Sequence, residues 1–410
     1  MGSLLVVLII LGCVAYQYLK GTLVKSFVVV ITSICASVVA FGYFELLANV
    51  FISREILVLW AYPLSFALLF ILAFAVLQTI AAQLTRRPID LGLLPERIGR
   101  VVCGIFLGFI VSGLLLTAAA MAPISPKYPY QRFDETSPDP ENPGKVLLNA
   151  DGFATGWFSI ISSGSFSGKR SFATLHPAFL DQLFLNRHEI DNRVSIITSS
   201  DAIEIPNKAV WPAPEGLKDS DGEKVSQKNE KGEELTIVRV EITNQAIKDD
   251  GVFTPSQLRV VCKQKNDDKN PLAGKGRNIY PYGYMKTANE LQKKRLTDHI
   301  EIKRSDLDNR GVKNIDFAFY VPDKFVPVLV EFKQNCINQL PERITADQAP
   351  TVVPFVKQPE PEKDTAAPGK PVEQPNSPPP PPKEPETSSN KPGLSNIGKS
   401  IVGDQLDEDK

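Results

Sequence analysis

The residues able to do chemistry are few and widely spaced. His176, His188 and His299 are the only histidines among 410 residues, and no Gly-Asp-Ser-Gly-Gly segment occurs. Residues 164–168, Gly-Ser-Phe-Ser-Gly, carry phenylalanine where a Gly-x-Ser-x-Gly nucleophile turn needs serine. No acid pair, HExxH motif or cysteine–histidine cluster offers metal or acid–base chemistry. We therefore predict a protein that is not an enzyme and needs no cofactor, with an extracytoplasmic hydrolase as an alternative.

Glu45 is the one acidic residue within an apolar run, and it admits two interpretations. A carboxylate at membrane depth is costly and points to function, such as a proton or ion path in a small transporter or channel. About twenty residues into its run, however, Glu45 would approach the outer interface, where water and headgroups are within reach. We favour the structural interpretation and keep the other as an alternative.

Two further features of the polar half leave alternatives open. Cys262 and Cys336 either form a disulfide, if this half is extracytoplasmic, or are two buried thiols. Residues 274–277, Gly-Lys-Gly-Arg, lack the ending of a phosphate loop and are either a solvated basic loop or a site for an anionic polymer or headgroup. Residues 280–284, rich in tyrosine, could stack on a sugar or peptide or serve as core and turn.

Four apolar runs precede these features. They cover residues 3–19, 26–52, 56–84 and 101–123, and the last is an uncharged stretch long enough to span a bilayer core of roughly 30 Å. Gly104, Gly108 and Ser112 recur every four positions in it and so share one helix face. Small residues at this spacing allow close helix packing in membranes, so we expect four transmembrane helices packed as a bundle.

Charges between the runs predict the direction of insertion. Two loops are cationic, and they carry six basic residues: Lys20, Lys25, Arg86, Arg87, Arg97 and Arg100. The other side has three: Arg54, Lys127 and Arg132. Because cytoplasmic loops are enriched in lysine and arginine, the N-terminus and everything after residue 123 should lie outside the cytoplasm.

The first 120 residues resemble a known family. The turn at residues 20–27, Lys-Gly-Thr-Leu-Val-Lys-Ser-Phe, and residues 91–97, Leu-Gly-Leu-Leu-Pro-Glu-Arg, leading into Gly104 and Gly108, are similar to the colicin V production protein (CvpA) family over residues 3–120. Arg100 stands where that family usually has glycine. The resemblance implies a multi-pass protein of the bacterial inner membrane, linked to toxin production and secretion or to envelope maintenance. It also requires a protease to be considered, since some relatives carry one after the fourth helix.

After a Pro-rich stalk at residues 124–148, residues 149–345 read as a β-rich domain. Alternating apolar residues predict strands at 236–243 and 258–263, and a hairpin of 315–321 with 326–332. Residues 176–184 should form a short helix, and residues 149–161 should lie near the membrane surface. We expect a sandwich, immunoglobulin-like in general shape. Residues 346–410, with prolines at 378–382, should be a disordered tail.

We therefore hypothesise a membrane bundle that displays a β-rich extracytoplasmic domain and acts through protein contacts. The partners implied are the lipid bilayer, envelope or secretion proteins and, as an option, further copies of the chain. Nucleic acid is not expected, because the net charge is -1 and no basic stripe with aromatics occurs.

Overall fold

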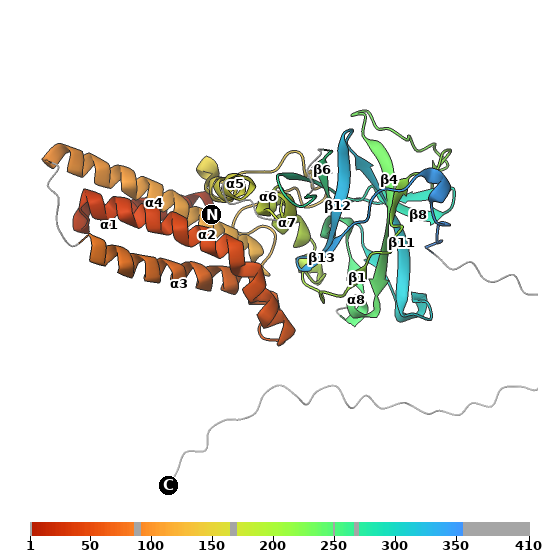
Figure 1. The fold of residues 1–410 in the computed structure, drawn as a ribbon, viewed down its shortest axis with the longest axis horizontal. Helices are drawn as coiled ribbons and strands as arrows, with labels where there is room; N and C mark the ends of the chain where they lie inside the picture. Colours follow the sequence, from red (N-terminus) through yellow and green to blue (C-terminus); the bar gives the residue numbers. More distant parts are fainter. Residues whose placement is uncertain (1, 86–91, 165–169, 249–250, 266–269, 356–410) are drawn as a thin grey trace, which may run out of the picture. The chain divides into compact units, whose positions relative to one another are not determined.

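Four long apolar helices form the first part of the molecule. The computed structural model describes residues 2–85, 92–164, 170–248, 251–265 and 270–355. The four helices lie side by side (Figure 1) and are α1 (Gly2–Lys20), α2 (Leu23–Ser53), α3 (Ala61–Leu84) and α4 (Leu93–Met121). Each belongs to a segment long and apolar enough to cross a bilayer. The chain is therefore a membrane protein.

Glycines allow α4 to approach α1 closely. A Cβ added to Gly104 would lie 2.7 Å from Val14 Cα, and one added to Gly108 would lie 2.6 Å from Ile10 Cα. No side chain larger than hydrogen fits at such distances, so the two backbones pack against each other. Ser112, the third residue of the predicted stripe, is fully buried and donates a hydrogen bond to the carbonyl of Phe109 on its own helix.

Most of the cationic residues used to predict insertion lie at one end of this bundle. Arg100 near the start of α4 contacts the carbonyl of Tyr18 near the end of α1, at 3.4 Å. Lys20, Lys25 and Arg97 lie within a few residues of this contact along the chain. Arg86 and Arg87 fall outside the described residues. The end that carries these charges is opposite the end from which residues 122 onward leave α4.

Residues 122–197 form a layer of short helices next to the bundle, which we call the juxtamembrane layer. Its helices are α5 (Ala150–Ser163), α6 (Phe172–Leu175) and α7 (Phe179–Asn186). The region predicted to be a Pro-rich stalk, residues 124–148, folds back on itself: the Gly144 amide donates to the Arg132 carbonyl at 2.7 Å, and both Arg132 and Phe133 are buried. Burial of aromatic and apolar side chains outweighs the extended preference of the prolines. The short helix expected at residues 176–184 begins at Phe179 and ends at Asn186.

The rest of the described chain is β-rich, as predicted. Its elements are β1 (Ile203–Glu204), β2 (Val210–Pro212), β3 (Lys218–Asp219), β4 (Glu234–Thr243), α8 (Asn244–Lys248), β5 (Val252–Phe253), β6 (Leu258–Gln264), β7 (Gly276–Ile279), β8 (Gly283–Thr287), β9 (Glu290–Lys293), β10 (Ile300–Glu301), β11 (Val312–Val321), β12 (Phe325–Phe332) and β13 (Cys336–Gln339). A seven-stranded sheet has the order β1-β4-β11-β8-β9-β3, with β2 also paired to β4. A four-stranded sheet has the order β13-β12-β6-β7, and β10 pairs with β5.

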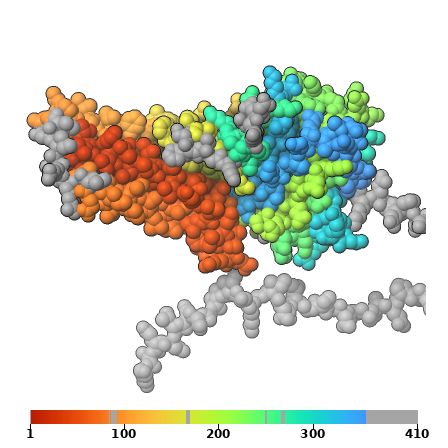
Figure 2. Space-filling view, viewed as in Figure 1, coloured from red at the N-terminus to blue at the C-terminus, as the bar shows by residue number. Residues whose placement is uncertain are grey.

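The two larger sheets share one hydrophobic core. Alternate residues of β4 enter it, and Val238 and Val240 face Phe317 and Ile315 across the ladder with β11. Val260 of the other sheet joins the same cluster. In the space-filling view the residues of this domain, coloured green to blue, form one continuous mass (Figure 2). The alternation that predicted β4 therefore has its physical cause in this shared core.

The predicted hairpin between β11 and β12 is wrong. The two strands follow each other closely in sequence, but β11 pairs with β4 and β8, whereas β12 pairs with β6 and β13. Residues 322–324 therefore carry the chain from one sheet to the other. Pro327, which has no amide to donate, lies beside a bulge in the pairing of β12 with β6.

The domain continues beyond the boundary predicted at residue 346. Asp316 is fully buried and binds Arg239 through both carboxylate oxygens, at 2.6 and 2.8 Å. Arg239 also donates to the Thr351 carbonyl at 2.7 Å, and Asp316 accepts from the Val353 amide at 3.2 Å. Residues up to at least Phe355 are thus attached to the large sheet. The predicted tail from residue 356 onward lies outside the described residues.

Candidate functional site

A buried polar network begins at Glu45, the acidic residue within the apolar run of α2. Glu45 of α2 lies with its Oε1 atom 2.6 Å from Nε2 of His176, the residue that ends α6. The distance is that of an ion pair, although the ring N–H is not aligned for a hydrogen bond. The His176 side chain is 2% exposed and that of Glu45 is 29% exposed. A side chain of the juxtamembrane layer therefore neutralises the carboxylate of a membrane helix.

The network continues from His176 into the four-stranded sheet. Nδ1 of His176 lies 3.1 Å from Oε1 of Gln182, whose amide nitrogen donates to Glu331 of β12. The second oxygen of Glu331 pairs with Arg259 of the neighbouring strand β6. Arg259 also donates to the Leu175 carbonyl at 2.8 Å. Five contacts thus join α2, α6, α7 and two strands.

The charges in this network are mutually compensated. Burial disfavours the imidazolium form of His176, but the carboxylates of Glu45 and Glu331 outweigh burial and the nearby guanidinium of Arg259, so the pKa of His176 is raised. Burial raises the pKa of Glu331, and the attraction of Arg259 and His176 offsets part of this effect. In its charged form the His176 ring carries a proton on each nitrogen, which agrees with an oxygen atom near each of them.

This geometry does not match a hydrolytic triad. In such a triad one histidine nitrogen is oriented by a carboxylate and the other receives a proton from the nucleophile. Here Nε2 of His176 faces Glu45 and Nδ1 faces Gln182, so neither is left for a hydroxyl. The Gly-Ser-Phe-Ser-Gly segment considered at the sequence level falls largely outside the described residues.

Aromatic rings surround the network and connect the same elements. The Phe41 ring of α2 stacks on Phe158 of α5 with centroids 4.9 Å apart and meets Phe172 of α6 edge-on at 5.6 Å. Phe172 and Phe179 flank the imidazole of His176, at 5.1 and 5.2 Å. A single buried cluster includes side chains from α2, α3, α4 and the juxtamembrane layer. These contacts exclude water from the charges and strengthen their interaction.

Arg187 provides a second connection, at the end of α4. Its guanidinium donates to the carbonyls of Ala119, at 3.0 Å, and Tyr128, and lies 4.2 Å from the centroid of the Phe184 ring. The side chain is almost fully buried, and burial lowers its pKa to about 10. A cation next to the last carbonyls of a helix stabilises the negative end of its dipole. Arg187 therefore caps the membrane helix from which the juxtamembrane layer begins.

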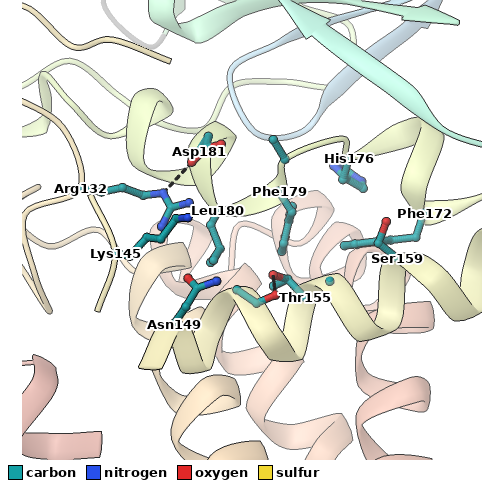
Figure 3. Close-up of a pocket in the computed structure, with 13 residues that line it drawn as sticks. Arg132, Lys145, Asn149, Thr155, Ser159, Phe172, His176, Phe179, Leu180 and Asp181 are labelled. Carbon is teal, nitrogen blue, oxygen red and sulfur yellow. Dashed lines mark hydrogen bonds and ion pairs between the residues drawn. The ribbon is translucent and has the colours of Figure 1, made fainter. Parts of the chain in front are cut away.

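A cavity of about 230 Å³ lies between α5 and α7 (Figure 3). Arg132 and Asp181 lie at one end, joined at 2.6 Å, with Lys145 nearby, and His176 lies at the other end. Asn149, which precedes α5, and Thr155 and Ser159 of α5 line it from the side of that helix. Burial raises the pKa of Asp181, an effect that the neighbouring Arg132 partly offsets.

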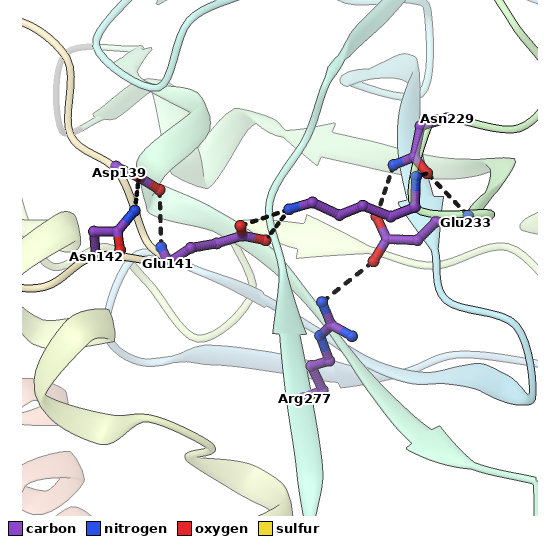
Figure 4. A network of polar contacts seen from close by, with 7 residues as sticks. Asp139, Glu141, Asn142, Asn229, Glu233 and Arg277 are labelled. Carbon is purple, nitrogen blue, oxygen red and sulfur yellow. Dashed lines mark hydrogen bonds and ion pairs between the residues drawn. The ribbon is translucent and has the colours of Figure 1, made fainter.

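A larger groove of about 630 Å³ lies between the juxtamembrane layer and the β-rich domain. Tyr280, Tyr282 and Tyr320 line it, and the rings of the last two meet edge-on at 5.0 Å. Its rim carries paired charges (Figure 4), in which Lys231 binds Glu141 at 2.5 Å and Arg277 binds Glu233 at 3.2 Å. The basic segment expected to be a solvated loop is therefore partly strand β7, with Arg277 ion-paired. Tyrosine rings surrounded by a polar rim are typical of protein–protein interfaces.

The other residues considered from the sequence are two cysteines of the β-rich domain and the two remaining histidines. Cys262 and Cys336 are free and buried, as in the second of the two alternatives. They face Pro327 and Phe332 on β12, roughly 16 Å apart along that strand, whereas a disulfide requires Cα atoms within about 7 Å. His188 contacts the Glu135 carbonyl, and His299 lies 3.4 Å from Glu189. Among the described residues no group of three or more histidine, cysteine or acidic side chains could hold a metal ion.

Sequence reasoning identified Glu45 but missed its partners. Arg259 and Glu331 each interrupt an otherwise apolar stretch, in residues 258–262 and 328–332. Opposite charges within two apolar strands were a signal of an ion pair in the interior. The apolar stripe that predicted a helix at 176–184 did not point to His176 or Gln182, because both are polar and their partners lie in distant parts of the chain.

Comparison with protein-family models, curated proteins and solved structures gives no match. The fold and this site together define the class: a membrane protein with four candidate membrane-spanning helices, joined through a buried charged network to a β-rich domain.

Proposed function

We propose that this chain is a non-enzymatic protein of the bacterial inner membrane that acts in envelope maintenance or secretion through protein contacts. The membrane helices anchor it, and the β-rich domain, sandwich-like with two sheets over one core, presents the binding surface outside the cytoplasm. The resemblance of residues 3–120 to the colicin V production family agrees with this proposal. The groove with Tyr282 and Arg277 is the surface at which a partner binds.

The observation that carries the proposal is the link from Glu45 through His176 and Gln182 to Glu331. It attaches the binding domain to the membrane helices through groups that are costly to bury unless they are paired. Such a link holds the domain against the bundle, as a scaffold that displays a binding surface requires. It also gives Glu45 a structural partner, which favours a scaffold over a transporter in which Glu45 moves protons or ions.

Site-specific crosslinking in intact cells tests the proposed contact surface. A photo-reactive amino acid at Tyr282, in the groove, should capture a reproducible envelope protein. The same group at Lys208, an exposed residue outside the groove lining, should not. Arg277→Glu should abolish the product at position 282, because it reverses a rim charge. Equal products at both positions, or none at 282, would refute the proposed surface.

Reporter fusions test on which side of the membrane the β-rich domain lies. Alkaline phosphatase fused after residue 355 should be active, and a fluorescent protein at the same position should remain dark. The reverse result would place the β-rich domain in the cytoplasm. For the transporter alternative, Glu45→Gln that abolished substrate-dependent transport by folded protein in vesicles would favour that function over a scaffold.

A further inference from the structure

Helix α5 divides two cavities of opposite character. The polar cavity with Arg132 and Lys145 lies on the side of Gly152, Thr155 and Gly156. An apolar groove of about 290 Å³ lies on the side of Phe153, Ala154 and Trp157. At 100° per residue these two sets occupy nearly opposite faces of the helix. A ligand that filled both would therefore have a polar end and an apolar end.

The walls of the apolar groove are membrane helices. Ile34 comes from α2, Ile110 and Leu114 come from α4, and the exposed ring of Phe106 stands at its side. The groove is therefore continuous with the faces of α2 and α4 that contact lipid in a bilayer. Ser37 is the one polar side chain of the lining, and its hydroxyl is bonded to the Ile34 carbonyl. An occupant of this groove must be apolar.

The face of α5 beside the apolar groove is itself apolar and partly exposed. Phe153 is 42%, Trp157 45% and Ile160 61% exposed, at the spacing of one helix face. Figure 3 shows α5 crossing the membrane helices rather than running along them. An amphipathic helix in this orientation lies in the membrane interface, where tryptophan is enriched. That headgroup layer is roughly 5–8 Å thick on each side of the hydrocarbon core, comparable with the width of a helix of about 10 Å.

The polar cavity offers one cation that a phosphate can meet. Arg132 pairs with Asp181, and the buried carboxylate of Asp151 lies near that pair, so the balance of charge there depends on Lys145. Lys145 is exposed and lies a few residues before the start of α5. At Gly156 an added Cβ would meet nothing within 4 Å, so the edge of the helix is open there.

We propose that α5 lies in the middle of a binding site for one phospholipid, with the acyl chain on one side of the helix and the phosphate on the other. An acyl chain fills the groove between α2 and α4, the glycerol passes the edge of α5 at Gly156, and the phosphate meets Lys145 and Arg132. The occupant is a lipid of the adjacent leaflet rather than free phosphate, because the groove is apolar and open to the bilayer. This proposal requires only that the helices span a membrane, so it does not depend on the partner contacts proposed above.

Native mass spectrometry of the full chain in mild detergent tests the acyl-chain site. The wild type should retain one phospholipid per chain. Ile34→Trp should fill the groove and lower the retained fraction at least fivefold. Ile31→Trp, on the same helix but exposed and outside the lining, should leave it unchanged. No retained phospholipid, or equal retention by both variants, would overturn the proposal.

The phosphate contact and the position of the chain have separate tests. Lys145→Glu should lower retention of an anionic phospholipid, whereas Lys208→Glu should not. Brominated phosphatidylglycerol added at one molecule per chain should quench a fluorescence component that Trp157→Phe removes. This measurement does not use a groove-filling variant and so does not depend on its folding. Quenching that grows only in proportion to bulk lipid would show non-specific contact and would also overturn the proposal.

Discussion

Nε2 of His176 lies 2.6 Å from the carboxylate of Glu45, which couples a residue of the juxtamembrane layer to a membrane helix 131 positions earlier in the chain. Both ends of the imidazole are engaged, because Gln182 lies at the other nitrogen. The pair is therefore part of a structural chain that ends at Glu331 and Arg259 in the β-rich domain.

Removal of the imidazole should destabilise the protein. His176→Gln leaves the Glu45 carboxylate without its cation, and a buried group that loses its partner costs about 1–3 kcal/mol. Thermal unfolding in detergent micelles measures the change. His299→Gln is the matched control, because His299 is 47% exposed and lies 3.4 Å from its carboxylate. We expect less than about 1 kcal/mol there. Equal losses for the two variants would contradict a structural role specific to His176.

Stability should fall as the pH rises above neutrality. The pKa of His176 is raised in the folded protein, whereas in the unfolded chain it is about 6.5. The folded state therefore binds this proton more tightly, and its stabilisation is complete below about pH 6.5 and lost as the pH rises through the folded value. Unfolding temperatures measured from pH 5 to pH 9 should show the decline in the wild type. In His176→Gln the decline should be smaller, and an identical profile would refute the assignment.

The hydrogen bonds from Arg187 to the carbonyls at and beyond the end of α4 should contribute to the stability of the protein. Arg187→Ala leaves the carbonyls of Ala119 and Tyr128 without this donor and removes the contact with Phe184. We expect a loss of about 2–4 kcal/mol, from two unsatisfied carbonyls at about 1–3 kcal/mol each with partial rehydration. Arg170→Ala, at an exposed position, should change stability by less than about 0.5 kcal/mol. Chemical denaturation of both variants in micelles provides the comparison.

The contact between α1 and α4 should reject larger side chains. Gly104→Leu and Gly108→Leu place carbons where Val14 and Ile10 already lie, at a cost of about 1–3 kcal/mol each. Gly12→Leu is the control, because a Cβ there meets nothing within 4 Å. Thermal aggregation of the detergent-solubilised variants measures the effect. If Gly12→Leu were as damaging as Gly104→Leu, helix propensity or insertion would explain the loss rather than packing.

Short-range patterns carried the sequence-level predictions that were confirmed. Uninterrupted apolar runs predicted the four long helices, since a helix in lipid satisfies its backbone internally. Alternation predicted β4, whose apolar face enters the shared core, although its opposite face is largely buried as well. The prediction that β11 pairs with β12 was wrong, because proximity in sequence favours pairing but does not determine which sheet the second strand joins. The sequence did not reveal how residues 124–148 fold, because their proline content favours an extended chain whereas residues such as Phe133 are buried.

The sequence by itself determined that this is a membrane protein with four apolar helices followed by a β-rich domain, because hydrophobic length and period act over a few turns or strand residues. Tertiary structure alone decided that Glu45 meets His176, that Cys262 and Cys336 stay apart, and that α5 lies between a polar and an apolar cavity. These relationships join residues far apart in the chain. They depend on how several elements pack at once, and no local pattern of residue types encodes that packing.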